Sequence, residues 1–306
     1  MSQDLPKNLY QIVVVDGKST DKTANIVKKY IKIYPNMIKL YENSKEWQAA
    51  GRNLAIKTEN ESNLFAYIDG HCIADSEWLR SLYNSYRELK DPYIGGIGSI
   101  HRSPKDELLF GKAIEQVFCS FIGGFGSSYK PARTRKKVNT VPFALYNKEA
   151  LEKAGLYDED MRYGEDFSLN FKLRNKGYNI YVEPKAVVYY YKRNSLFSFS
   201  KQMYNYGIAK AIIKKKYPSA VGITSCIPSI SIIILMFSFA LSFYLGMSIV
   251  VISIIVLYLI AVYCSTLMSA FAEKQWLFIR TMPKIYIIEH FAFGIGFLFG
   301  LAKKGW

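Results

Sequence analysis

Four acidic residues occupy positions where an α/β protein usually holds its ligands. Asp16 and Asp69 each follow a short apolar run and precede a glycine, and the pair Glu165-Asp166 follows Gly164 at the start of a helical pattern. Ligands of α/β sheets bind outside the carboxyl ends of the strands, where such side chains can reach them. Carboxylates there can accept hydrogen bonds, hold a divalent cation or remove a proton. The pattern predicts one acidic binding edge.

Each acidic position also has a purely structural interpretation. Asp-Gly after a strand is a common turn, and acidic residues at a helix start offset the helix dipole by about 0.3–1 kcal/mol. Taken singly, the two interpretations are evenly balanced. Three such positions at the edge of one sheet favour the binding role.

Strands and helices alternate through the first two thirds of the chain, which predicts a mostly parallel α/β sheet with flanking helices. The expected strands are 12–15, 38–41, 64–68, 93–100, 141–146, 178–182 and 186–191. The expected helices are 47–58, 76–90, 148–154, 165–176 and 196–215. We expect residues 102–140, rich in Gly, Ser, Lys and Arg, to form a flexible region over the carboxyl edge of the sheet.

The last third of the chain has the composition of a membrane segment. No charged side chain occurs from Ala220 to Ala272, and about 20 apolar residues suffice to cross a bilayer. We expect crossings near 225–244 and 248–270, with Gly246 between them. A buried helical core is the disfavoured alternative, because soluble cores rarely place two uncharged helices end to end. A third apolar segment, 285–302, either spans the membrane or lies in its interface.

The formal net charge is +15, and most of it precedes the first expected crossing. Five lysines lie just before that crossing: Lys201, Lys210, Lys214, Lys215 and Lys216. The positive-inside rule then places the N-terminal domain in the cytoplasm, as part of a multi-pass protein of the cell membrane. We expect this charge to meet anionic lipid head groups or a lipid carrying phosphate, and we expect no nucleic-acid partner. The four cysteines show no paired spacing, so no disulfide framework is predicted.

Five motifs, in this order, resemble inverting family 2 glycosyltransferases. They are V-V-D-G-x-S-x-D-x-T (14–23), A-G-R-N-L-A (50–55), Y-I-D-G-H (67–71), P-F-A-L-Y (142–146) and G-E-D-F-x-L-N-F-K-L-R (164–174). The branch resembling succinoglycan-type exopolysaccharide enzymes is closest and shares the hydrophobic tail. The resemblance implies a GT-A fold over residues 1–218 and a membrane domain over 219–306. It also implies hexosyl-type transfer from a nucleotide-diphosphate sugar donor to a glycan or lipid-linked acceptor in polysaccharide or cell-surface glycan synthesis.

The resemblance implies residue roles on the donor side. Asp16 matches an aspartate that binds the nucleobase or ribose. Arg52 and Asn53 match positions near the diphosphate, where a guanidinium suits phosphate geometry. Arg193 matches a basic position that binds either the diphosphate or a lipid-linked phosphate. The structural alternative for Arg52 and Asn53 is that both are solvent-exposed polar residues of a helix.

The resemblance also implies a metal ion and a base. Asp69 matches the first aspartate of the family's Asp-x-Asp metal motif, which here ends in His71, and the implied cofactor is Mg²⁺ or Mn²⁺. A histidine ligand would favour Mn²⁺; alternatively His71 touches phosphate or is a turn residue. Asp166 matches the general base that deprotonates the acceptor, with Glu165 as a supporting contact, and in-line attack inverts the anomeric carbon.

Relatives in this family begin with a β-α unit that the chain as given does not contain. We expect a start codon assigned too late, a truncated gene or a partner that supplies the unit. Two other functions remain open: an inactive relic or accessory nucleotide-binding membrane subunit, and a transporter or scaffold. At most three hydrophobic segments are few for a transporter.

Overall fold

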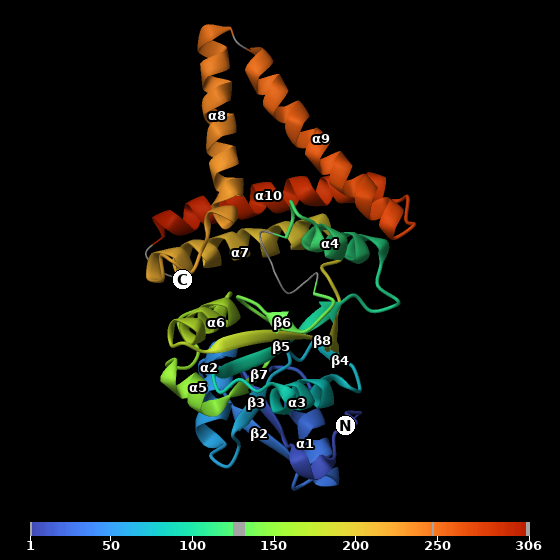
Figure 1. Cartoon of the computed structure of the whole chain (residues 1–306), viewed down its shortest axis with the longest axis vertical. Coiled ribbons are helices and arrows are strands. Elements are labelled where there is room, and N and C mark those ends of the chain that lie inside the picture. Colours follow the sequence, from blue (N-terminus) through green and yellow to red (C-terminus); the bar gives the residue numbers. More distant parts are fainter. Residues whose placement is uncertain (1, 125–131, 247, 304–306) are drawn as a thin grey trace. The chain divides into compact units, whose positions relative to one another are not determined.

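The computed structural model describes residues 2–124, 132–246 and 248–303 and divides the chain into two compact units (Figure 1). The first unit combines Met1–Arg102 with Pro131–Tyr190, and the second combines Ser103–Lys130 with Tyr191–Trp306. Segment 103–130 therefore belongs with the C-terminal helices. The sequence predicted a boundary at residue 218. In the structure, the apolar helices that follow this residue share a unit with segments 103–130 and 191–218.

The first unit contains two sheets. β1 (Ile12–Asp16) and β2 (Ile38–Glu42) form a parallel pair. The larger sheet has the order β3-β7-β5-β8-β4, with β6 beside β8. Its strands are β3 (Leu64–Ala66), β4 (Cys72–Ala74), β5 (Ile94–Arg102), β6 (Lys136–Lys137), β7 (Leu145–Asn147) and β8 (Asn179–Tyr190). Within this sheet β5–β8 is the parallel pair and the other recorded pairs are antiparallel, so the sheet is mixed instead of mostly parallel.

Helices and a buried core fix the sheet of the first unit. The helices are α1 (Thr23–Ile33), α2 (Gln48–Thr58), α3 (Trp78–Glu88), α5 (Lys148–Lys153) and α6 (Glu165–Asn175), preceded by the short 3-10 helix η1 (Lys7–Leu9). Trp78 of α3 packs into the same apolar cluster as Ile97 of β5 and Val188 of β8, and its indole N–H donates to Ser99 Oγ at 2.6 Å. The cluster buries one face of the large sheet.

Glycine in β5 allows a tyrosine to support helix α6. A Cβ built on Gly96 would lie 2.5 Å from the Tyr146 ring, so only glycine fits there. Tyr146 is fully buried, and its hydroxyl donates to Asn170 Oδ1 of α6 at 2.9 Å. This contact anchors α6 to the sheet and thereby sets the position of its N-terminus.

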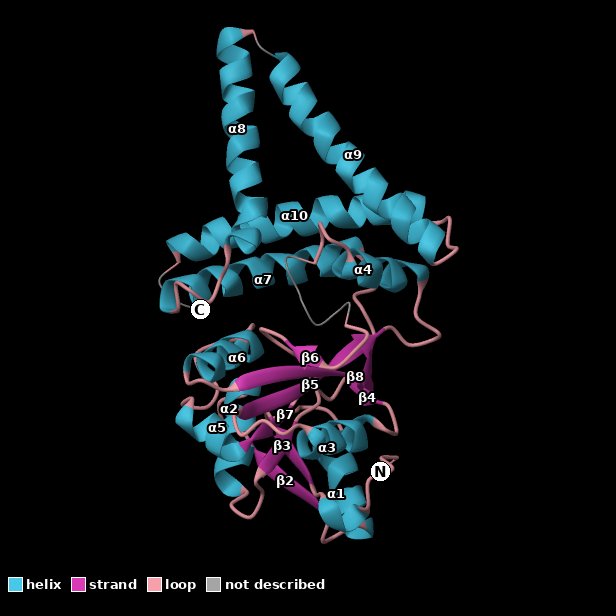
Figure 2. Cartoon of the chain, in the orientation of Figure 1, coloured by secondary structure: helices cyan, strands magenta, loops and turns pink. Residues whose placement is uncertain are grey.

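The second unit is helical (Figure 2). It contains α4 (Leu109–Cys119), α7 (Leu196–Lys216), the 3-10 helix η2 (Ile223–Cys226), α8 (Ile227–Leu245), α9 (Ser248–Ala272) and α10 (Phe278–Ala302). Segment 102–140 was predicted to be flexible throughout, but α4 and β6 lie within it; its centre, 125–131, lies outside the described residues. Within the described residues of the second unit, three segments are long and apolar enough to cross a membrane: Ile223–Leu245, Ser248–Ala272 and Phe278–Ala302.

Helices α7 and α10 run side by side in the same direction, and α8 and α9 rise from them as a hairpin (Figure 1). Glycines bring α7 and α10 to backbone contact. A Cβ on Gly207 would lie 2.1 Å from the carbonyl oxygen of Phe293, and one on Gly296 would lie 2.1 Å from that of Tyr204. At the other end, Lys215 Nζ donates to the carbonyl oxygen of Leu301 at 3.4 Å. The two helices therefore behave as one packed pair.

Candidate active site

Three short segments of the first unit position the charged side chains of the site. Helix α2 lies close to β1, because a Cβ on Gly51 would already contact the Val15 side chain at 3.3 Å. Helix α6 begins directly after Gly164, whose φ of +77° is a left-handed conformation that glycine adopts freely. After β3 the chain turns at Asp69, where the Cys72 N–H donates to the Asp69 carbonyl at 3.0 Å.

Arg52 of α2 bonds to three carboxylates at once. Its Nη1 donates to Glu165 Oε1 at 2.8 Å and to Asp166 Oδ1 at 2.7 Å. Its Nη2 donates to Asp69 Oδ1 at 2.9 Å. The Arg52 side chain is only 12% exposed. One guanidinium thus joins the carboxylate predicted to bind metal to the carboxylate predicted to act as base.

Aromatic rings enclose this guanidinium. The Arg52 Cζ lies 3.9 Å from the centre of the Tyr67 ring and 5.3 Å from that of Tyr157. Tyr146 stacks on Tyr67 with a centroid distance of 6.1 Å. Burial raises the pKa of all three phenols, so these rings remain neutral at physiological pH. Cation–π contact and a low local dielectric strengthen the electrostatic interactions inside this cage.

The carboxyl of Asp166 has an unusual affinity for its proton. Burial raises the pKa of Asp166 from its ordinary value to about 7, and the negative charges of Glu165 and Asp69 act in the same direction. Arg52 opposes the shift by stabilising the carboxylate. A base with a pKa near the working pH combines a useful unprotonated fraction with a useful affinity for the proton.

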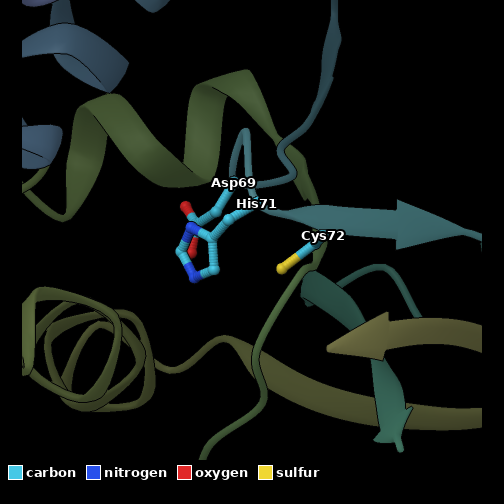
Figure 3. Close-up of side chains that lie close together, drawn as sticks. All are labelled: Asp69, His71 and Cys72. Carbon is cyan, nitrogen blue, oxygen red and sulfur yellow. The ribbon is translucent and has the colours of Figure 1, made fainter. Parts of the chain in front are cut away.

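The carboxylate of Asp69 also lies beside two other potential metal ligands. One ligand atom each of Asp69, His71 and Cys72 lies within 4.8 Å of the others (Figure 3). The His71 ring is packed edge-on against Tyr190, with centroids 5.3 Å apart. This donor set combines oxygen, nitrogen and sulfur, and it fits a divalent ion of borderline softness.

The other predicted site residues are placed differently. Asp16 accepts bonds from the backbone N–H and the hydroxyl of Ser19, which closes the turn after β1. Asn53 is buried; its amide donates to the Tyr157 carbonyl at 3.0 Å and its Oδ1 accepts from the Tyr157 N–H at 2.9 Å. It therefore holds the segment that carries Tyr157. Arg193 belongs to the second unit. Donor contacts of these three residues remain predictions.

Sequence reasoning assigned no role to the aromatic cage or to Cys72. Tyr67 and Tyr146 lie inside motifs that carried the family resemblance, so their positions were available as a signal. Tyr157 carried no comparable signal. Cys72 follows His71 directly. The cysteines were considered only for the spacing of pairs, and this criterion does not detect one cysteine next to Asp69 and His71.

Comparisons with known proteins identify the family of this chain. Residues 1–155 match the family described as "Glycosyl transferase family 2". The chain is 30% identical over 307 residues, 99% of its own length and 90% of the relative's, to a dolichyl N-acetyl-alpha-D-glucosaminyl phosphate 3-beta-D-2,3-diacetamido-2,3-dideoxy-beta-D-glucuronosyltransferase of Methanococcus voltae. It is 26% identical to succinoglycan biosynthesis protein ExoA of Rhizobium meliloti (strain 1021), covering 71% of this chain and 65% of that protein.

Among solved structures, the chain is similar to a fragment of S. aureus TarS in complex with UDP. It has a TM-score of 0.47 and 19% identity, and the match covers 69% of this chain and 59% of that one. The family match spans half of the chain and the Methanococcus relative spans nearly all of it. The chain therefore belongs to glycosyltransferase family 2 and is a glycosyltransferase.

Proposed function

We propose that this protein transfers a sugar, with inversion, from a nucleotide-diphosphate donor to a hydroxyl of a lipid-linked glycan. The observation that carries this proposal is the set of bonds from Arg52 to Asp69, Glu165 and Asp166. A transferase of this kind needs a group near the leaving diphosphate and a base near the acceptor. In this arrangement both are within reach of one guanidinium.

Asp166 would act as the general base. The acceptor hydroxyl gives its proton to the Asp166 carboxylate while its oxygen forms a bond to the anomeric carbon. The bond from that carbon to the donor phosphate oxygen breaks on the opposite face, and the nucleoside diphosphate leaves with the electron pair. Arg52 holds the Asp166 carboxylate in place, and Glu165 orients Arg52 by accepting from the same Nη1.

Asp69 and His71 would hold the divalent ion of the family, Mg²⁺ or Mn²⁺. The fit rests on their converging ligand atoms and on the charge balance, because Arg52 alone does not neutralise three carboxylates. When bound, such an ion neutralises charge that develops on the leaving diphosphate. If Asp69 turned towards such an ion, Arg52 Nη2 would be available to donate to the diphosphate, while Nη1 kept its bonds to Glu165 and Asp166.

We also propose how the second unit meets the membrane. The α8–α9 hairpin would cross the bilayer and return, whereas α10 would lie in the cytoplasmic interface. Helix α10 is packed along α7 through close contacts at Gly207 of α7 and at Gly296 and Gly300 of α10. Helix α7 ends with Lys214, Lys215 and Lys216, and each lysine at the centre of a bilayer costs about 2.5–3.5 kcal/mol. Because α10 cannot leave α7 without breaking this packing, it stays at the depth that α7 tolerates.

The same arrangement supports a proposal for the acceptor class. The name of the Methanococcus relative describes a dolichyl phosphate sugar as its acceptor. A lipid-linked acceptor presents its sugar at the membrane surface, and lysines at that surface attract its phosphate. We propose that the acceptor of this protein is likewise a polyprenyl-type phosphate carrying a sugar, and that the catalytic unit faces the cytoplasm.

A further strand would complete the sheet of the first unit. Among the described residues, β1 pairs only with β2 and β3 pairs only with β7, so both present an open edge. An isolated two-stranded sheet is marginally stable. We propose that a strand supplied by a longer form of the chain, or by a partner, joins β1 to β3. The N–H groups of Val15 and Ala66 point away from β2 and β7, towards the open edges. Hydrogen exchange at Val15 and Ala66 should slow in an extended form; equal rates in both forms would contradict the idea.

Transfer by the purified full-length chain in detergent micelles tests the function. Labelled nucleotide sugars would be offered with polyprenyl phosphate sugars as acceptors and Mg²⁺ or Mn²⁺. Asp166→Asn should reduce transfer at least 100-fold, the lower end of base catalysis, with donor affinity retained. Glu149→Gln is the matched control, since Glu149 lies on the surface of α5 in a pair with Lys153. Undiminished transfer by Asp166→Asn would refute the base assignment.

A further inference from the structure

The thiol of Cys72 shares a small volume with the two predicted metal ligands. Its sulfur, a ring nitrogen of His71 and a carboxylate oxygen of Asp69 lie within 4.8 Å of one another. Figure 3 shows the Asp69 carboxylate close to the His71 ring and the Cys72 sulfur on the same side of the turn. Modest side-chain rotations would bring all three atoms to the roughly 2.0–2.3 Å that divalent ions require.

The backbone that carries these side chains is held in place. The Cys72 N–H closes the turn by donating to the Asp69 carbonyl at 3.0 Å. Cys72 then opens β4, where it pairs with Tyr190 of β8. The Tyr190 ring in turn packs against the His71 ring. Strand pairing and ring packing together restrict where the three ligand atoms can go, which is the preorganisation that a metal site needs.

The position of Cys72 at the rim of the core limits the directions available to its sulfur. Cys72 is half-buried and packs beside the cluster that contains Trp78 and Val188, whereas the next residue, Ile73, is 56% exposed. At this boundary the Cys72 thiol can contact either the apolar cluster or the polar side chains of the turn at Asp69. Packing alone would account for a small apolar residue here, but it gives no reason for a sulfur within reach of an imidazole and a carboxylate.

We propose that Cys72 is a third protein ligand of the metal site, which then holds its ion through oxygen, nitrogen and sulfur. This inference rests on the metal role proposed for Asp69 and His71. Binding converts the Cys72 thiol to a thiolate and releases its proton to solvent. Thiolate sulfur favours Zn²⁺ and Co²⁺, whereas Mg²⁺ prefers oxygen ligands alone. Cys72 therefore sets the metal preference of this chain apart from that of an all-oxygen Asp-x-Asp site.

Cobalt provides a test that does not depend on sugar transfer. Co²⁺ titrated into the full-length protein in detergent should produce a thiolate-to-cobalt charge-transfer band in the near ultraviolet. Cys72→Ser should abolish this band and weaken Co²⁺ binding by about 10- to 100-fold, at least the cost of losing an outer-shell partner, with a smaller change for Mg²⁺. Cys119→Ser is the matched control, because Cys119 is an exposed cysteine of α4, and it should retain the band.

A second measurement covers the case in which Cys72→Ser does not fold. Bound Co²⁺ should protect Cys72 of the unaltered protein from alkylation by iodoacetamide, as read by mass spectrometry, while Cys119 reacts at the same rate with and without the ion. A band that survives in folded Cys72→Ser overturns the inference. So does Co²⁺ that binds without a band and without protection of Cys72.

The two proposals fail in different ways. Transfer supported by Mg²⁺, together with bound Co²⁺ that gives no thiolate band, would retain the proposed function and remove Cys72 from the site. A thiolate band in a protein that transfers no sugar from any nucleotide donor would retain the metal site and remove the function. Asp69→Asn should weaken Co²⁺ binding in either case, since Asp69 contributes the carboxylate.

Discussion

At the scale of single residues, the site is a balance between one cation and three anions. Arg52 faces Asp69, Glu165 and Asp166 inside a cage of neutral tyrosines. A buried cluster with excess negative charge is stable only if a carboxyl takes up a proton or another cation enters. The raised pKa of Asp166 is the first of these responses. A divalent ion bound at Asp69 would be the second response. Such an ion would also neutralise charge on the diphosphate of the donor.

The pKa of Asp166 gives a direct prediction for the pH dependence of transfer. Since burial raises this pKa to about 7, Asp166 holds its proton below that pH and cannot accept one from the acceptor. The value of kcat/KM should therefore rise roughly tenfold per pH unit below about 7 and level off above it. Steady-state kinetics between pH 5.5 and 9 would measure this. A flat profile across that range would assign the base to another group.

Removal of Arg52 should destabilise the first unit strongly. Arg52→Ala leaves three carboxylates in a mostly buried site, and breaking such a pair costs about 3–5 kcal/mol of unfolding free energy. We expect about 3 kcal/mol, because Asp69 and Asp166 remain 23% and 29% exposed. The loss should be smaller at pH 5 than at pH 8: without Arg52 the folded-state carboxyl pKa values rise, so folding favours protonated carboxyls and stability falls as pH increases.

Chemical denaturation in micelles, followed by circular dichroism, measures this loss. Arg80→Ala is the control, since Arg80 is 47% exposed in its pair with Asp4, and surface pairs contribute less than about 1 kcal/mol. Equal stability of Arg52→Ala and the unaltered protein at pH 8 would show that the cluster is not buried as described.

At the scale of elements, long periodic segments were predictable from the sequence and short ones were not. Helix 165–176 was expected and α6 spans Glu165–Asn175. Crossings were expected near 225–244 and 248–270, and the apolar helices α8 and α9 lie there; that they cross a membrane stays a prediction. Strands 178–182 and 186–191 form a single strand, β8, whose pairing with β5 shifts register between Ser99 and Ile100. Three-residue strands such as β4 carry too few positions for a period of two to appear.

The candidate site shows the same limit. Motif order and strand ends predicted that Asp16, Asp69, Glu165 and Asp166 share one edge. Arg52 bonds to the last three, whereas Asp16 accepts bonds from Ser19 in the turn after β1. The sequence did not predict that Arg52 bridges all three, because this depends on how closely α2 approaches α6 and the turn at Asp69. It also did not predict that Asn53, the next residue, turns into the core. Neighbours on a helix face different directions, and only packing decides which one meets the site.

Close packing of α7 on α10 is an element-scale feature that mutation can test. Gly207→Val would push a side chain into the Phe293 carbonyl, 2.1 Å from the position of its Cβ. Overpacking typically costs about 1–3 kcal/mol, so the thermal transition in micelles should fall by several degrees. Gly222→Val is the control, since the nearest atom to a Cβ there is Thr224 Oγ1 at 3.9 Å. Equal transitions would mean that α7 and α10 are not in backbone contact.

At the scale of the whole chain, the composition separates into a charged part and an uncharged part. No charge occurs from Ala220 to Ala272, a stretch that α8 and α9 share. Helix α10 differs, because it carries Arg280, Lys284, Glu289 and His290 and packs on a helix that ends in lysines. Hydropathy alone groups α10 with the other two helices. Its packing on α7, whose last turn is basic, is the basis for the proposal that α10 lies in the interface, because charged side chains are costly inside a bilayer.

This difference predicts on which side of the membrane the end of α10 lies. Lys284→Cys and Lys303→Cys, each in a chain whose four cysteines are replaced by serine, would be labelled in oriented membrane vesicles with a maleimide that does not cross bilayers. If α10 lies in the interface, both cysteines react from the cytoplasmic side. Ser248→Cys, at the start of α9, is the control for the opposite side. If α10 spans the membrane, Lys303→Cys reacts together with Ser248→Cys instead, and the glycine contacts between α7 and α10 would then have to break on insertion.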